Sequence, residues 1–353
     1  MRRRAAAFVL VALLLVMTAR VILGDRSAVA ELRAVPAGRA DARVDRAVTQ
    51  ADVAELGRTV EQSVAYVEDL FQHKFTEPPK LVVFGDAASF SSGLAGLFNY
   101  SESDAARSAS SYGGIYDHAT ATIAVNLQTI AADDRTATFD HELTHYIMRE
   151  LTAGRQLPAW FEEGIATLSE RHLGADRWPD EDALVGRAIG AEGRVGLAQL
   201  ETLADWHGAY PRFGQSLYLY AATAASQMRF RAGWPGMLAL LSEVAAGRPF
   251  AEAYRAASGE SVADLDLRIH EDRAPRLIAR PRRGGDAQYT LFSGAPLTEE
   301  KVTIGGQSTY VVTFTVRTDD LGIYRGSFGS TAPQGVYQVG VAGARVDLTI
   351  EHR

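Results

Sequence analysis

The segment His141-Glu142-Leu143-Thr144-His145 contains residues of the types and spacing that metal chemistry requires. Residues four apart on a helix lie on the same face, one turn from each other, so His141 and His145 could bind one ion. Glu142 would lie beside that ion without binding it, where it could act as general base towards a zinc-activated water. The pattern therefore predicts a zinc site that hydrolyses amide bonds.

This spacing has meaning only if the segment is helical, and its flanks predict a helix. Helix-forming residues run from Thr136 to Glu150 after an acidic start at 133–134. A stripe of apolar residues follows the helical period: Ala137, Phe139, Leu143, Ile147 and Leu151. The alternative is an ordinary amphipathic helix whose histidines fall four apart by chance, since the chain contains 8 histidines.

A catalytic zinc needs a third protein ligand and one open position. We predict a second helix from Leu157-Pro158, because proline is tolerated in a first turn. Adjacent carboxylates at Glu162 and Glu163 follow, and then Gly164 inside the helix. Glycine there costs about 1 kcal/mol against alanine, which favours a close backbone approach to the first helix. One of the two glutamates is the expected third ligand; the alternative is an exposed acidic pair without function.

The two segments H-E-L-T-H at 141–145 and W-F-E-E-G-I-A-T at 160–167 resemble the gluzincin group of zinc metallopeptidases, in particular its bacterial peptidase-MA-like branch. The resemblance extends in outline over residues 50–275, but only these two segments are specific. It implies Zn²⁺ as cofactor, with His141, His145 and Glu163 as ligands and Glu142 as general base. It also implies an α+β fold, in which a small sheet is joined to a helical lobe.

The sequence departs from the family at the residue that supports the oxyanion. The family carries a tyrosine on a later helix, just ahead of a pair such as Gln215-Ser216, and the position here is Phe213. Tyr210, Tyr218 and Tyr220 lie near it in sequence, and Tyr210 is one helical turn away. Loss of one oxyanion donor typically costs about 10²- to 10³-fold in rate.

A second departure concerns the type of peptidase. Related aminopeptidases have a Gly-x-Met-Glu-Asn strand whose glutamate binds the free amine of the substrate. The corresponding segment, 112–117, has no glutamate, and Asp117 is a poor substitute. We therefore expect an endopeptidase acting on a peptide or protein substrate. The alternative is a weak or inactive pseudopeptidase that serves as a peptide-binding or envelope assembly module.

The N-terminus predicts export. Three arginines at 2–4 precede an apolar run from Ala5 to Met17, and residues 1–30 are expected to be a signal peptide or a membrane anchor. If this segment is not cleaved, residues 5–23 would attach the chain to the membrane. The expected location is extracytoplasmic, either secreted or anchored.

Charge and cysteine content exclude other classes of function. A net charge of −7 and the lack of a basic patch exclude nucleic acid as partner. With no cysteine in the chain, the ligand that deformylases require beside H-E-x-x-H is missing. The histidines outside 141–145, His118 among them, show no ligand spacing.

The remaining segments predict the domain organisation. Residues 31–49 are expected to be a linker, 50–273 the catalytic domain, 274–286 a second linker and 287–353 a β-sandwich resembling bacterial immunoglobulin-like modules. Within the catalytic domain, the Ser- and Asp-rich stretch 100–111 is typical of a loop, and 112–116 and 120–126 are typical of strands. The β-sandwich could bind substrate or a surface, and the alternative is a spacer.

Overall fold

The structure is a computed structural model in which residues 32–171, 183, 185–189, 195–272, 274–281, 287–293, 297–306, 311–319, 322–328, 335–341 and 344–350 are described. The predicted signal peptide or anchor at 1–30 lies outside this part of the chain. Within the described residues, no helix has the length and apolar character needed to cross a membrane.

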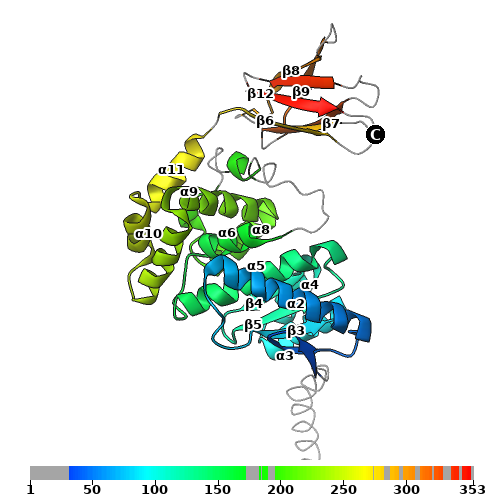
Figure 1. Ribbon diagram of the computed structural model, residues 1–353, viewed down its shortest axis with the longest axis vertical. Coiled ribbons are helices and arrows are strands. Elements are labelled where there is room, and N and C mark those ends of the chain that lie inside the picture. Colours follow the sequence, from blue (N-terminus) through cyan, green and yellow to red (C-terminus); the bar gives the residue numbers. More distant parts are fainter. Residues whose placement is uncertain are drawn as a thin grey trace, which may run out of the picture. The chain divides into compact units, whose positions relative to one another are not determined.

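The chain has mixed α and β structure, as the sequence predicts, and forms two compact units (Figure 1). Unit 1 comprises Met1–Glu150 and Ser169–Ala175, and unit 2 comprises Leu151–Leu168 and Asp176–Arg353. The strands of unit 1 are β1 (Arg33–Ala37), β2 (Ala40–Val44), β3 (Lys80–Phe84), β4 (Gly114–Asp117) and β5 (Thr122–Asn126). Its helices are α2 (Gln50–Phe71), α3 (Ala87–Leu97), α4 (Glu102–Ser111) and α5 (Arg135–Leu151, whose last residue belongs to unit 2).

The prediction that 31–49 is a linker is wrong, because this segment supplies two strands. β1 and β2 form an antiparallel hairpin, turned at Gly38 with φ of 59°, and β2 pairs in parallel with β3. The five strands form one sheet in the order β1-β2-β3-β5-β4. The Ala- and Arg-rich composition hides this hairpin, since its strands gain their stability from pairing within the sheet.

The two faces of this sheet carry different helices. Val82, Phe84 and Ala124 face α3 and α4, where they form a hydrophobic core with Phe90, Leu94, Ala105 and Ala109. The stretch 100–111 is thus mostly the helix α4, capped by Ser101, and not the predicted loop. On the opposite face, Gly114 of β4 lies against α5. The helices α2 and α5 are linked by ion pairs of Arg135 with Asp52 and Glu55.

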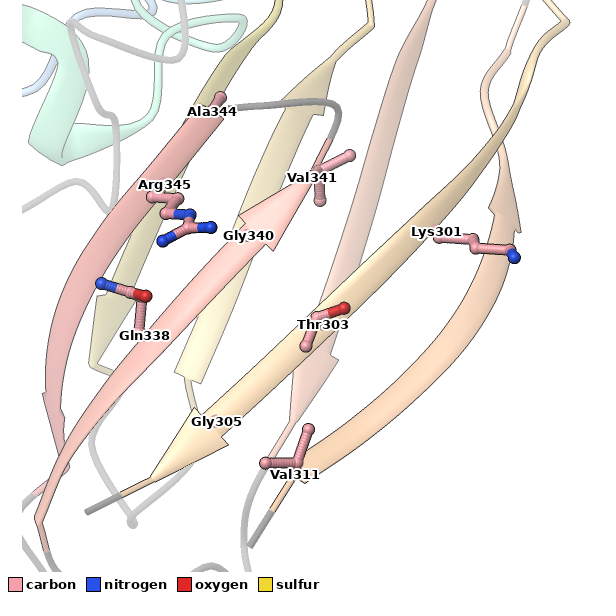
Figure 2. A pocket seen from close by; sticks show the side chains of 9 residues that line it. All are labelled: Lys301, Thr303, Gly305, Val311, Gln338, Gly340, Val341, Ala344 and Arg345. Atoms are coloured by element: carbon pink, nitrogen blue, oxygen red, sulfur yellow. The ribbon is translucent and has the colours of Figure 1, made fainter.

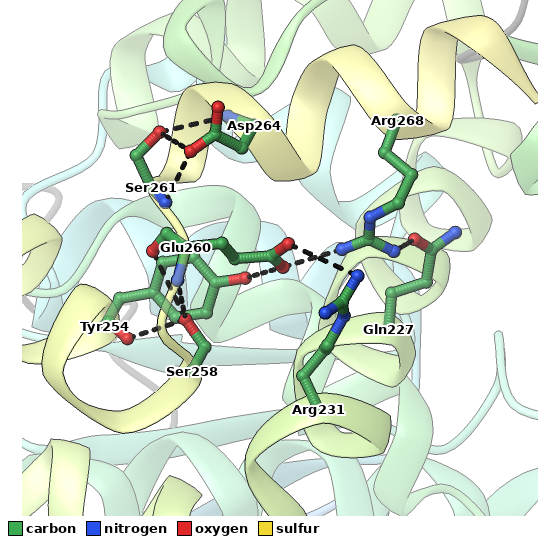
Figure 3. Close-up of polar contacts among 8 residues, drawn as sticks. All are labelled: Gln227, Arg231, Tyr254, Ser258, Glu260, Ser261, Asp264 and Arg268. Carbon is green, nitrogen blue, oxygen red and sulfur yellow. Dashed lines mark hydrogen bonds and ion pairs between the residues drawn. The ribbon is translucent and has the colours of Figure 1, made fainter.

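The helices described in unit 2 include α6 (Ala159–Ser169, its last residue in unit 1), α8 (Leu203–Phe213), α9 (Ser216–Ala245), α10 (Phe250–Ser258) and α11 (Val262–Glu271). Helix α9 is broken at Gly233, whose φ of 67° and ψ of 169° are not helical. Glu260 joins three of these helices (Figure 3). Its carboxylate accepts hydrogen bonds of 2.6 Å from Tyr254 of α10 and Arg268 of α11, and lies 3.9 Å from Arg231 of α9.

The C-terminal part of unit 2 is all β in its described residues. One sheet has the order β10-β7-β6 and the other β12-β11-β8-β9. Both contribute to one hydrophobic core, which includes Tyr289, Leu291, Ile304 and Val339, so the predicted sandwich is present. The strands are β6 (Arg276–Pro281), β7 (Ala287–Phe292), β8 (Glu299–Gly306), β9 (Val311–Arg317), β10 (Ile323–Phe328), β11 (Gly335–Val341) and β12 (Ala344–Ile350).

The prediction of a linker at 274–286 is wrong for Arg276–Pro281, which form β6 and pair along their whole length with β7. Residues 282–286 lie outside the described part of the chain. The outer face of the four-stranded sheet contains a shallow hollow of about 350 Å³ (Figure 2). It lies where Gly305 of β8 and Gly340 of β11 lack side chains, between Lys301, Thr303 and Arg345.

Candidate metal centre

Helix α5 carries His141 and His145 on one face, and the structure brings Glu163 of α6 to them. One ligand atom from each residue lies within 4.8 Å of the others. His145 and Glu163 are buried, and His141 is largely buried, with 13% of its side chain exposed. Two imidazole nitrogens and one carboxylate oxygen form a donor set suited to zinc, and bonds of about 2.1 Å in a tetrahedral site would separate the ligand atoms by roughly 3.4 Å. The group could therefore hold a metal ion after small movements of its side chains.

The sequence left open which glutamate of the pair belongs to this group, and the resemblance pointed to Glu163. The structure places Glu163 with the histidines, while Glu162 lies outside the group. Glu162 is also buried, with 7% of its surface exposed. Burial and the charge of Glu163 raise the pKa of Glu162 to about 8. Glu162 is thus not the exposed carboxylate that the alternative interpretation of the pair required.

Gly164 has a different partner from the one predicted. A Cβ at this position would lie 2.4 Å from the carbonyl oxygen of Ala221 and 3.1 Å from the Cβ of Ala225. Both residues belong to α9, so the close backbone approach is between α6 and α9 and not between α6 and the helix that carries the histidines. Glycine at 164 sets the depth at which α6, and with it Glu163, packs in unit 2.

The carboxylate of Glu170 orients His141. Its Oε1 lies 2.9 Å from Nδ1 of His141, and both side chains are largely buried. A carboxylate only accepts hydrogen bonds, so the contact makes Nδ1 the protonated nitrogen and leaves Nε2 for a metal. Such outer partners fix both the tautomer and the ring orientation of a ligand. Nothing in the sequence indicated this role, since Glu170 follows the end of α6 at no ligand spacing.

The segment Ser169–Arg171 is held against α5 by further contacts. Arg171 donates to both oxygens of Asp140, at 2.8 Å from Nε and 2.9 Å from Nη2, and the hydroxyls of Ser169 and Thr144 are 2.7 Å apart. Asp140 has no exposed surface. Burial raises the pKa of Asp140, and the hydrogen bonds from Arg171 act in the opposite direction. These contacts keep Glu170 within reach of His141.

Replacement of Glu170 by alanine is expected to lower zinc affinity by about 10- to 100-fold, the usual effect of losing an outer partner of a ligand histidine. Glu170→Gln retains a hydrogen-bond acceptor and should lose less. Competition with a chromophoric chelator measures both constants. Equal affinity of Glu170→Ala and the parent chain would show that His141 needs no such support.

The carboxylate of Glu142 lies against strand β4. A Cβ on Gly114 would be 2.7 Å from Oε1 of Glu142 and 2.9 Å from Cγ2 of Thr138. Glu142 is buried, with 6% of its surface exposed. Only glycine at 114 leaves room for this carboxylate, and β4 is the edge strand of the sheet next to it. The sequence did not predict this role, because glycine in a short strand can equally mark a bulge, a bend or a strand end.

Three aromatic side chains around the centre were not assigned from the sequence. The ring of His118 lies 6.3 Å from that of His145, and the ring of Tyr116 lies 6.0 Å from it. Burial raises the pKa of Tyr100, and the charges of Asp117 and Glu142 add to this effect. His118 is thus adjacent to a proposed ligand although it lacks ligand spacing in the sequence.

The tyrosines near Phe213 have other contacts. Tyr220 is fully buried and its hydroxyl donates to Asp266 at 2.8 Å. Tyr210 belongs to the same helix, α8, as Phe213. Its hydroxyl oxygen lies 3.4 Å from Nε2 of Gln215, and its ring packs edge-on against Tyr218. Tyr220 is therefore engaged in the core of unit 2.

Asp117 has a structural role in the β4–β5 hairpin. Its carboxylate accepts hydrogen bonds from the backbone N–H and the hydroxyl of Thr120, at 2.8 and 2.6 Å. These bonds close the turn between the two strands. Asp117 thus stabilises the hairpin that carries the edge strand β4.

The arrangement combines a set of metal ligands, a buried carboxylate beside them and an edge strand. No family model matches the chain, and no curated protein matches it.

Proposed function

We propose that the chain is an exported zinc-dependent peptidase of the gluzincin type. The observation that carries the proposal is the grouping of His141, His145 and Glu163, with Glu142 on the same helix turn as the first ligand. This donor set, two histidines and a glutamate, is the one that catalytic zinc uses in several peptidases. Export is supported by the N-terminal arginines and the apolar run that follows them.

Zinc bound at this centre would lower the pKa of a water molecule and polarise the scissile carbonyl. Glu142 would take the proton from that water and pass it to the leaving amine, as general base and then general acid. Its burial against Gly114 keeps bulk water away from the carboxylate and fixes its direction. Glu170 keeps His141 in the tautomer that binds metal.

The edge strand β4 would bind the substrate. It pairs with β5 on one side, and among the described residues no strand occupies its other side. An extended peptide could pair there by backbone hydrogen bonds, which give affinity with little dependence on side chains. The bonds from Thr120 tie the carboxylate of Asp117 into the hairpin turn, and β4 has no glutamate for a free N-terminus, which favours an endopeptidase.

The proposal is tested with the full chain, purified in detergent, and a quenched-fluorescent unfolded protein. We expect about one zinc per chain by metal analysis, cleavage of the substrate, loss of cleavage with a chelator and recovery when zinc is returned. A chain that binds no zinc would overturn the metal site.

Phe213 favours a second candidate, a pseudopeptidase that binds peptides without cutting them, because the family's oxyanion tyrosine is replaced. This second function would hold if the chain carried zinc and bound extended peptides, yet cleaved nothing in a broad panel of unfolded substrates.

A further inference from the structure

We infer that Tyr116 is a positioning residue for His145, holding its imidazole in the orientation that metal binding needs. The inference rests on the proposed function, since it concerns a ligand of the proposed zinc. It assigns to strand β4 a second role beside that of binding substrate.

The alternation of side chains along β4 sets the geometry. Ile115 packs into the core formed with α3 and α4, so Gly114 and Tyr116 point to the opposite face of the sheet. On that face, Gly114 contacts Glu142 and Tyr116 contacts His145. Two neighbouring positions of one face therefore touch the general base and a metal ligand.

The ring of Tyr116 is parallel to that of His145, with an angle of 8° between their planes and 6.0 Å between centroids. Tyr116 is itself fixed by two edge-on neighbours, Tyr146 at 6.0 Å and His118 at 4.9 Å. Tyr146 in turn packs edge-on against Phe75 at 5.6 Å. With 7% of its surface exposed, Tyr116 is buried beside His145, and its neighbours restrict its movement.

A histidine ligand must direct a nitrogen lone pair at the ion, but the last torsion of its side chain is broad and only weakly restricted. Glu170 restricts this torsion in His141 through a hydrogen bond. In His145, the parallel ring of Tyr116 packs beside the imidazole, and this ring pairing favours the orientation in which the two planes stay parallel. The two histidines are thus oriented by different physical means.

The test compares zinc affinity in three variants of the full chain. Tyr116→Leu removes the ring, and we expect zinc affinity to fall by about 10-fold or more, as for other outer partners of a ligand. Tyr116→Phe keeps the ring and should retain affinity within about twofold. Ile115→Ala is the matched control, because it loosens the same strand on the face away from His145.

Cobalt substitution gives a readout that does not depend on activity, since the visible bands of Co²⁺ report the geometry of its ligands. We expect these bands to be unchanged in Tyr116→Phe and Ile115→Ala and shifted in Tyr116→Leu. If Tyr116→Leu does not fold, His118→Ala removes one edge-on neighbour at the end of the strand, and it should lower zinc affinity by a smaller factor.

The inference is overturned if Tyr116→Leu binds zinc as tightly as the parent, or if Ile115→Ala loses as much zinc affinity as Tyr116→Leu. If Tyr116→Leu does not fold, parental zinc affinity in His118→Ala overturns it instead. Failure of the proposed function is a separate result, because in that case the parent chain itself would take up no zinc.

Discussion

Glu142→Gln is expected to reduce kcat by about 10²- to 10⁴-fold, the usual contribution of a general acid–base catalyst. The amide has nearly the same size as the carboxylate, so it fits against Gly114 without new contacts, but it cannot take up a proton from water. KM and zinc content should stay close to those of the parent, because Glu142 is not among the metal ligands. Steady-state cleavage of the quenched substrate, with metal analysis of the same preparation, measures both.

The matched control is Glu150→Gln on the same helix. Glu150 accepts hydrogen bonds from Thr76 and lies 3.2 Å from His73, away from the metal group. The kcat of the Glu150→Gln variant should equal that of the parent chain. If Glu142→Gln retains parental activity, the general base is another residue, and the mechanism proposed for Glu142 is wrong.

Arg171→Met is expected to destabilise the fold by about 3 kcal/mol, near the lower end of the range for breaking a buried ion pair. Asp140 is fully buried and would lose both hydrogen bonds from the guanidinium. The lower end applies because a third of the Arg171 side chain is exposed. The guanidinium also lies 3.8 Å from the ring centroid of Tyr66, a favourable contact that methionine cannot replace. Urea unfolding of the parent chain and of Arg171→Met measures the difference in their free energies of unfolding.

Two further variants distinguish the effect of breaking this buried ion pair from the effect of removing any arginine charge. Arg107 forms an exposed ion pair with Asp104, and Arg107→Met should change the free energy of unfolding by less than about 1 kcal/mol. In the double variant Asp140→Leu, Arg171→Met neither charge of this pair remains, so part of the lost stability should return. Equal losses for Arg171→Met and Arg107→Met would contradict the role given to the buried pair.

The group of candidate metal ligands was the part of the molecule most open to prediction from sequence. A helix converts the spacing of His141 and His145 into a shared direction, and the run of helix-forming residues from Thr136 to Glu150 predicted that helix within one residue at each end. Glu163 came from the resemblance, because nothing in the spacing alone relates it to the histidines across a turn between helices.

Other features depend on contacts that a local pattern cannot reveal. Glu170 reaches His141 only because Arg171 and Ser169 attach their segment to α5. Strand β1 lacks the apolar alternation of a typical strand, and the short alternation of β2 rests mainly on alanine, which is a poor strand former. Both strands are stabilised by pairing, since β1 pairs with β2 and β2 pairs with β3. Helix α4 has the composition of a loop, but Ala105 and Ala109 fall on one face and complete a core.

The start of β1 at Arg33 limits how far the proposed peptidase could act from a membrane. If residues 5–23 remain inserted, only residues 24–32 connect them to the sheet, and not the longer tether that the sequence had indicated. An extended chain spans at most about 3.5 Å per residue, so this tether could reach roughly 30 Å. If the chain is the proposed peptidase, such a short tether would keep it near the membrane, and its substrates would be selected in part by location before any contact with the candidate site.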